Sequence, residues 1–136
     1  ELVATWLEVK ENIAYINLAP TQDGVVLYPD LVKVKVDMFG QNIIGFEARN
    51  YAFNHIDRKF ETGITQQEAE SKLGFDYIVL NTRKAIISLE NDIEVLTYEF
   101  ACDRIGGLYY YYIDANTGEI VQILKVVDSN GTPLLI

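Results

Sequence analysis

The feature that most constrains this chain is an alternation of apolar and polar residues with a period of two, which runs through most of its 136 residues. Successive side chains of a β-strand point to opposite faces of a sheet, so this period is typical of strands with one buried face. Residues 31–37 are the clearest case, with three valines on one face and two lysines on the other. The pattern predicts a protein built mainly from antiparallel strands.

The same reading predicts strands along the whole chain. Residues 6–18 are expected to form one or two strands, interrupted by the polar residues 10–12. The further expected strands are residues 31–37, 43–53, 77–80, 84–89, 93–102, 108–113 and 120–127. Asp23-Gly24 is expected to form a tight turn, because glycine adopts the positive φ that such turns need.

One short helix is predicted at about residues 66–73, before Gly74. Thr65 and Glu68 form a capping box, in which the Thr65 hydroxyl accepts the Glu68 N–H and the Glu68 side chain reaches back to the Thr65 N–H. Gly74 is the expected left-handed residue at the carboxyl end. A helix of two to three turns is marginal alone, so we expect it to pack on a sheet.

Composition excludes several classes of function. Eleven Lys and Arg stand against twenty Asp and Glu, giving a net charge of −9, whereas nucleic acid and anionic membrane surfaces require a basic patch. A single histidine, His55, and a single cysteine, Cys102, cannot supply a His/Cys zinc site or a disulfide within one chain. We therefore predict no catalytic, cofactor-binding or metal-binding residues and no cofactor, with His55 at the surface or in a hinge and Cys102 a buried, inert thiol.

The segment from Asp114 to Glu119 superficially resembles a calcium-binding loop. An EF-hand needs glycine at position six and glutamate at position twelve, whereas here glycine stands at position five and Lys125 at position twelve. The simpler interpretation is a hairpin turn in which Asp114 and Asn116 bond backbone amides and Gly118 takes positive φ.

The chain also contains a weak internal repeat. Val36-Asp37 and Ile43-Ile44 align with Ile113-Asp114 and Ile120-Val121 at an offset of 77 residues, and upstream segments align at an offset of 82, so the loop of residues 20–28 is longer in the first copy. At this offset the helix of the first copy would precede Glu1. We therefore expect the chain to be a piece of a longer protein, with one sheet face of the first repeat uncovered by a helix and Trp6 among the exposed apolar groups.

Two motifs resemble the PepSY domain: Ile64-Thr-Gln-Gln-Glu-Ala69 with Leu73-Gly74, and Tyr111-Tyr-Ile-Asp-Ala-Asn-Thr-Gly-Glu-Ile120. Across nearly the whole chain, segments such as Tyr28–Val36 and Val95–Phe100 resemble the C-terminal PepSY tandem of YpeB-type spore germination proteins. The resemblance implies an α+β fold of two PepSY-like (cystatin-like) repeats with curved antiparallel sheets and one short helix in the second. The expected domains are residues 1–55, a linker at 56–63, and residues 64–136.

The resemblance also implies a function. It is that of a non-catalytic module, not an enzyme, that lies outside the cytoplasmic membrane near the spore inner membrane and cortex of a spore-forming bacterium. There it would inhibit or stabilise a cortex-lytic peptidoglycan hydrolase; self-association is possible, and membrane contact would come only through segments absent from this chain. The alternative is a small-ligand-binding or hydrolytic domain with a site between helix and sheet.

Three aromatic residues are the predicted partner-binding residues. In the run Tyr109–Tyr112, two rings should point into the core and two away, and outward tyrosines offer large contact area at low entropic cost. Tyr110 and Tyr112 are therefore predicted to bind a partner, as is Trp6. The alternative for the tyrosine run is cross-strand packing or burial under the helix.

Overall fold

The structure, a computed structural model, describes residues 1–126. The chain divides into two compact units, with the division between Arg58 and Lys59, inside the segment expected to be a linker. Both units consist mostly of antiparallel strands with one short α-helix each, so the protein belongs to the α+β class. Residues 127–136 of the second expected repeat lie outside the described residues.

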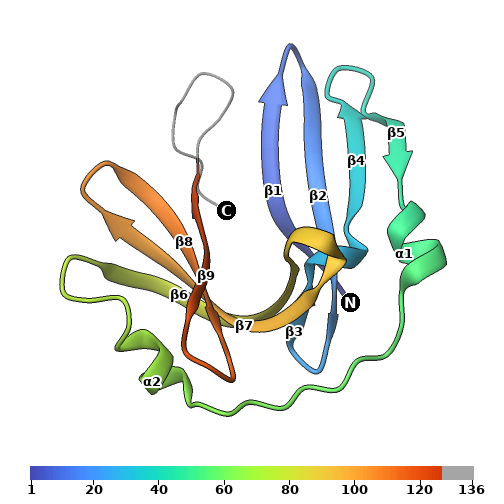
Figure 1. Cartoon of the computed structure of the whole chain (residues 1–136). Helices are drawn as coiled ribbons and strands as arrows, with labels where there is room; N and C mark the ends of the chain where they lie inside the picture. Colours follow the sequence, from blue (N-terminus) through green and yellow to red (C-terminus); the bar gives the residue numbers. More distant parts are fainter. Residues whose placement is uncertain (127–136) are drawn as a thin grey trace. The chain divides into compact units, whose positions relative to one another are not determined.

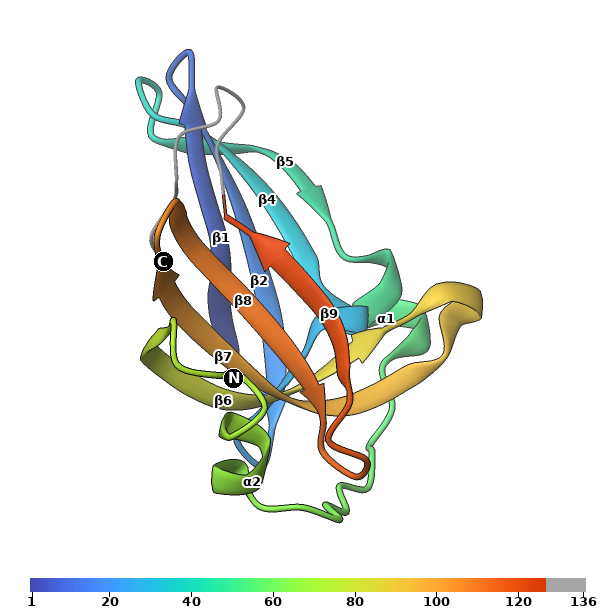
Figure 2. The ribbon, with the colours of Figure 1, turned by 60° about the vertical axis from the view of Figure 1, so that its left-hand side comes forward.

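The first unit contains five strands. They are β1 (Leu2–Lys10), β2 (Ile13–Gln22), β3 (Val25–Leu27), β4 (Val32–Asp37) and β5 (Asn42–Glu47), accompanied by the 3₁₀ helix η1 (Tyr28–Asp30) and helix α1 (Arg49–Asn54). β2 is central, with β1 and β4 on its two sides and β5 beyond β4, as Figure 2 shows. The short β3 pairs with the end of β2, and α1 follows β5 (Figure 1).

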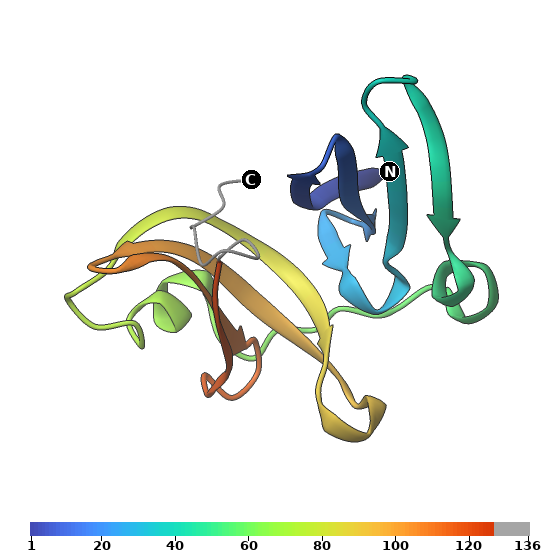
Figure 3. The ribbon, with the colours of Figure 1, turned by 90° about the horizontal axis from the view of Figure 1, so that it is seen from above.

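The second unit is an antiparallel meander. Its elements are α2 (Gln66–Glu70), β6 (Ile78–Ser88), the 3₁₀ helix η2 (Glu90–Asp92), β7 (Glu94–Arg104), β8 (Gly107–Asp114) and β9 (Ile120–Lys125). Each of its strands pairs with the next along the chain. Figures 1 and 3 both place α2 on one face of this sheet.

The two units share one order of strands, as the internal repeat predicts. β1, β2, β4 and β5 are joined in space in the same sequence as β6, β7, β8 and β9. The turn after Asp37 corresponds to the turn after Asp114, where each unit's last hairpin begins. β3 and η1 occupy the longer loop of the first copy.

Helix α2 begins with the predicted cap. The Thr65 hydroxyl accepts the Glu68 N–H at 3.1 Å and donates to the Glu68 carboxylate at 3.2 Å, so the Glu68 side chain returns to the hydroxyl rather than to the Thr65 N–H. The regular helix stops at Glu70, earlier than predicted, and hydrogen-bonded turns continue to Leu73. Gly74 follows with φ +85°, as expected for a left-handed residue.

Helix α2 covers an apolar face of the second sheet. Ala69 and Leu73 are buried, and the Tyr98 hydroxyl donates to the Ile64 carbonyl at 2.8 Å, which holds the start of the helix to β7. Phe100 and Cys102, which alternate with Tyr98 on the same side of β7, are fully buried. The prediction of a buried thiol is confirmed, and burial raises the pKa of Cys102 to about 11, so the thiol stays protonated.

The corresponding face of the first sheet is far more exposed. Leu7, Ile16, Val34 and Phe46 stand in register across its four main strands, so their side chains form one apolar row. The two ends of this row, Leu7 and Phe46, are 47% and 70% exposed. The helix of this unit, α1, contacts η1 and β4 and leaves these side chains open.

Two expected strands were wrong in detail. The expected strand at 43–53 ends at Glu47, and α1 follows, because helical spacing brings Tyr51 to His55, where the two rings stack at 4.8 Å. The expected break at 81–83 is absent: β6 is one strand that absorbs its irregularity as a register shift between Val79 and Asn81.

The start of the second unit is fixed by its last hairpin. The N–H groups of Gly63 and Ile64 both donate to the Ala115 carbonyl, at 2.9 and 3.1 Å. A Cβ on Gly63 would lie 2.9 Å from the Asn116 carbonyl oxygen, so only glycine fits this approach. The hairpin has part of the predicted form: Asp114 accepts the Asn116 and Thr117 N–H groups, and Gly118 has φ +80°. The hydroxyl of Thr117, and not the Asn116 side chain as predicted, accepts the Glu119 N–H at 3.2 Å.

Candidate functional sites

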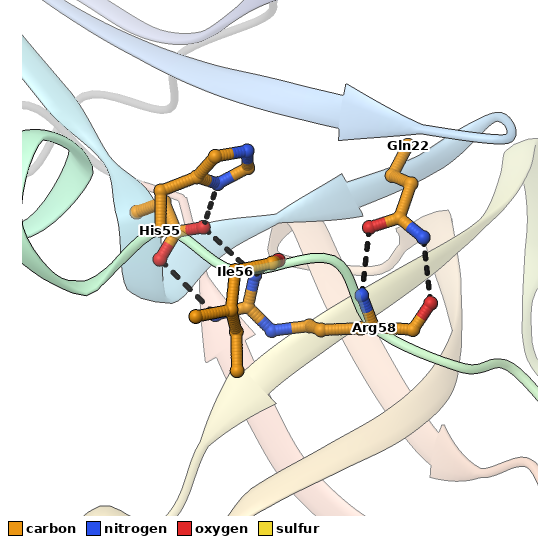
Figure 4. Close-up of polar contacts among 5 residues, drawn as sticks. Gln22, His55, Ile56 and Arg58 are labelled. Atoms are coloured by element: carbon orange, nitrogen blue, oxygen red, sulfur yellow. Dashed lines mark hydrogen bonds and ion pairs between the residues drawn. The ribbon is translucent and has the colours of Figure 1, made fainter.

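The chain's only histidine takes part in a buried cluster of the first unit. His55 Nδ1 lies 2.6 Å from Asp30 Oδ2, and the Arg58 guanidinium donates to both oxygens of the same carboxylate, at 2.8 and 3.1 Å. Asp30 is 1% exposed, at the end of η1. Figure 4 shows His55 and Arg58 converging on this carboxylate.

A second contact fixes the backbone of the same segment. The Gln22 side-chain amide donates to the Arg58 carbonyl at 2.6 Å, and its oxygen accepts the Arg58 N–H at 2.9 Å (Figure 4). The Gln22 side chain at the end of β2 thus bonds both the N–H and the carbonyl of Arg58, as the backbone of a neighbouring strand would. The side chains of His55 and Arg58 and the backbone of Arg58 are therefore bonded to the first unit. Residues 56–58 of the expected linker thus belong to that unit.

The electrostatics of Asp30 are those of a structural ion pair. Burial by itself would raise the pKa of Asp30, but hydrogen bonds and positive charge from Arg58 and His55 outweigh it and hold the pKa below the ordinary value of 3.8. A carboxylate gripped by a bidentate guanidinium has little capacity left to act as a base. The cluster joins residues about 25 positions apart, so no local motif reveals it; only Pro29, which favours the turn of η1, was readable beforehand.

The predicted partner residues Tyr110 and Tyr112 lie on the face of β8 away from α2. Tyr112 is 4% exposed and stands opposite Glu99, a buried carboxylate that is paired with Arg83 at 2.6 Å. Tyr110 is half-buried. The pKa of its hydroxyl is raised, mainly by burial and to a smaller extent by the negative charge of Glu99. Tyr112 thus offers little surface to a partner, while Tyr110 offers part of its ring.

Trp6 lies in β1 and is half-buried. It stands opposite Asn17, whereas the neighbouring Leu7 stands opposite Ile16 in the apolar row. Because directly opposed residues share a face, Trp6 is on the other side of the sheet from that row. The expected uncovered apolar surface therefore centres on Leu7 and Phe46 rather than on Trp6.

A second cluster gathers around Arg104 in the second unit. Its guanidinium lies 5.3 Å from the centre of the Tyr77 ring and 5.6 Å from that of Tyr109, and it donates to the Tyr111 hydroxyl at 3.5 Å. Tyr111 in turn donates to the Tyr77 hydroxyl at 2.7 Å. Lys125 Nζ lies 5.9 Å from the centre of the Tyr109 ring.

A hollow of about 460 Å³ adjoins this cluster between α2 and β6. Tyr77 belongs both to the cluster around Arg104 and to the lining of the hollow. The residues lining the hollow are Gln67, Glu70, Ser71, Leu73, Gly74, Tyr77 and Val79.

Neither a metal site nor a membrane span is found in residues 1–126. No three His, Cys, Asp or Glu side chains of this described part could together hold a metal ion. None of its helices has the length and apolar character needed to cross a membrane.

Each of the two units matches a model of a known protein family. Residues 1–61 match the model "YpeB sporulation, PepSY1 and PepSY2 domains", and residues 64–124 match "Peptidase propeptide and YPEB domain". The chain therefore belongs to the PepSY family, as a tandem of PepSY domains of the YpeB type. The expected resemblance is confirmed, and with it the assignment to a sporulation-protein family.

Individual relatives agree with this assignment. The chain is 31% identical over 134 residues to the sporulation protein YpeB of Bacillus subtilis and 33% identical over 120 residues to that of Halalkalibacterium halodurans. These matches cover 94% and 88% of the chain but only 29% and 27% of the relatives, so the chain spans less than a third of their length. Among solved structures, the Bacillus megaterium YpeB C-terminal domain matches with a TM-score of 0.87 and 29% identity, over 93% of this chain and 57% of that one.

Proposed function

We propose that this chain is a non-catalytic interaction module of a sporulation protein, and that it binds and stabilises or restrains a spore-cortex-lytic hydrolase. The family assignment supports a sporulation role. We place the protein outside the cytoplasmic membrane, near the spore inner membrane and cortex of a spore-forming bacterium. Self-association remains part of the same proposal, because one apolar surface can serve either contact.

The observation that carries the proposal is the exposed apolar row of the first sheet. Large apolar side chains exposed together on one face are typical of interaction surfaces. On β5, an edge strand of the first unit's sheet, Ile43, Ile44 and Phe46 are 66%, 51% and 70% exposed. A partner that covers this face would bury them as α2 buries the corresponding face of the second sheet.

The finer architecture belongs to the same proposal. We propose that the repeats extend over residues 1–55 and 64–136 and are joined by residues 56–63, of which 56–58 are bonded to the first unit. Each would be a cystatin-like arrangement in which a curved antiparallel sheet wraps around a helix. The first repeat would then receive its covering element from outside residues 1–126.

The test is a binding and co-stability assay with the cortex-lytic hydrolase of the same organism, using the full-length protein. The variant Ile43→Thr/Phe46→Thr should weaken binding at least about tenfold, since each loses an apolar contact of about 1–2 kcal/mol while threonine keeps the strand propensity. Ile105→Thr is the matched control, because Ile105 is 99% exposed in the β7–β8 turn and belongs to the second unit, whereas the row belongs to the first. Full-length protein that neither binds nor protects the hydrolase would overturn the proposal.

The hollow between α2 and β6 is the observation that favours the second candidate, a small-ligand-binding domain. It lies between helix and sheet, which is where the alternative function considered from the sequence would have its site, and its volume is within the range of ligand pockets. Its chemistry leads to the inference below.

A further inference from the structure

Arg104 is a cation held in place by aromatic rings instead of by a carboxylate. Among residues 1–126 it has contacts with Tyr77, Tyr109 and Tyr111 and no ion-pair partner. Its hydrogen bond with Tyr111 is the first cause that raises the pKa of the guanidinium, and burial with the Tyr77 hydrogen bond raises the pKa of Tyr111 to about 12. The tyrosine thus stays neutral and leaves the charge of Arg104 uncompensated.

A second cation with no ion-pair partner among residues 1–126 contacts the same aromatic ring. Lys125 lies opposite Tyr109 in the β8–β9 register, and its ammonium group lies over the same ring as the guanidinium of Arg104. Residues 64–136 carry five Lys and Arg against eleven Asp and Glu. Within the part of the chain that the structure describes, these two cations without ion-pair partners are a local reversal of charge in an acidic repeat, which favours an anionic group of a ligand.

The adjoining hollow limits what carries that group. Tyr77 lines it on one side, and the polar residues Gln67 and Glu70 of α2 line it together with Ser71, which follows α2 and whose hydroxyl donates to the Glu68 carbonyl at 2.6 Å. Closely spaced donors and acceptors beside a ring suit a compact ligand with many hydroxyl groups.

We propose that the Arg104–Lys125 pair and the hollow beside Tyr77 together bind a sugar that carries a carboxylate. The carboxylate is held by Arg104, which lies 5.3 Å from the centre of the Tyr77 ring, and Lys125 adds positive charge from the β9 side of Tyr109. The sugar ring lies against Tyr77 with its hydroxyl groups bonded to α2. This site is in the second unit and is separate from the apolar row of the first, so the two proposals stand or fall independently.

The experiment uses two sugars that differ by one acidic group. N-acetylmuramic acid carries a lactyl carboxylate that N-acetylglucosamine lacks, and binding of each to the 136-residue chain is followed by amide NMR titration. We expect shifts confined to residues around the hollow, and affinity for N-acetylmuramic acid at least about tenfold higher, the effect of one charge-assisted hydrogen bond.

Three variants complete the test. Arg104→Gln should abolish the preference and Lys125→Gln should reduce it, while Lys33→Gln, at an exposed lysine of β4, should leave it unchanged. Equal affinity for the two sugars, no binding of either, or a preference that survives Arg104→Gln would overturn the proposal. So would binding at this site of an acidic peptide in place of the acidic sugar.

Discussion

At the scale of single residues, the buried carboxylate of Asp30 has the largest structural consequence in the first unit. It receives Arg58 and His55 from a segment that has no regular secondary structure. Both Asp30 and the Arg58 side chain are nearly inaccessible, at 1% and 7% exposure. Removing one partner of such a pair leaves the other buried and uncompensated, which costs far more than the intact pair contributes.

Asp30→Asn keeps the shape of this side chain and removes its charge. We expect it to lower the free energy of unfolding of the first unit by about 3 kcal/mol at pH 7. Urea unfolding followed by the fluorescence of Trp6, the chain's single tryptophan, measures this directly. Asp57→Asn, an exposed change in the same segment, is the control and should stay within about 0.5 kcal/mol of the parent chain.

The effect of Asp30 should also depend on pH. Since its pKa is lowered in the folded unit, ionised Asp30 adds stability above the ordinary pKa of 3.8, and this is lost as pH falls through the lower folded value. The gap between the parent chain and Asp30→Asn should therefore be largest near neutral pH and shrink as the pH falls below the ordinary pKa of 3.8. A gap that is constant from pH 7 to pH of about 2.5 would contradict this assignment.

Side-chain chemistry was readable from the sequence only where partners are close along the chain. Thr65 with Glu68 and Asp114 with Gly118 were predicted because their partners lie within four positions. His55 was predicted at the surface or in a hinge, and it is exposed yet bonded to Asp30. That contact depends on how β3 and η1 return the chain, which no local pattern encodes.

At the scale of elements, alternation located the strands and missed their irregularities. β1, β2, β4, β7 and β8 overlap their predicted positions because apolar and polar residues alternate along much of each strand. β3 was not expected, since three apolar residues have no recognisable period. The shift between Val79 and Asn81 disturbs the alternation of β6, which made one strand read as two.

The cap of α2 can be tested at this scale. Thr65→Ala removes the acceptor of the Glu68 N–H and should lower the free energy of unfolding of the second unit by about 1 kcal/mol. Hydrogen exchange at the Glu68 and Ala69 amides reports the change locally. Thr65→Ser keeps the hydroxyl and should behave like the parent chain, so equal exchange in the two variants would show that the cap contributes nothing.

At the scale of the whole molecule, the repeat in the sequence corresponds to two units with the same order of strands. The match is visible in sequence because the turns after Asp37 and Asp114 keep their spacing from the strands around them. The two units differ in how one face of each sheet is buried. Helix α2 packs on this face of the second sheet, whereas the apolar row on the corresponding face of the first sheet is exposed. The sequence predicted an uncovered face with Trp6 and neighbouring apolar groups on it, and in the structure that face carries Leu7 and Phe46 while Trp6 lies on the other side of the sheet.

The junction between the units should tolerate insertion. Residues 59–63 have no regular secondary structure, and Glu61 is exposed. Adding Gly-Ser-Gly after Glu61 should change the urea midpoint of either unit by little, because loop-closure entropy grows slowly with length. The same insertion after Thr97 in β7, a fully buried position, should abolish cooperative unfolding of the second unit. Loss of structure in the first variant would show that the spacing at the junction is itself required.

The bonds from Gly63 and Ile64 to Ala115 also bear on the order of folding. Gly63 and Ile64 stand at the start of the second unit, and their partner Ala115 follows β6, β7 and β8 in the sequence. Forming these hydrogen bonds therefore closes a long loop of the chain. During synthesis from the amino end, the hydrogen bonds of Gly63 and Ile64 could form only after the hairpin that contains Ala115 has left the ribosome. The second repeat is therefore expected to become native in one late step, with its first residues among the last to gain protection.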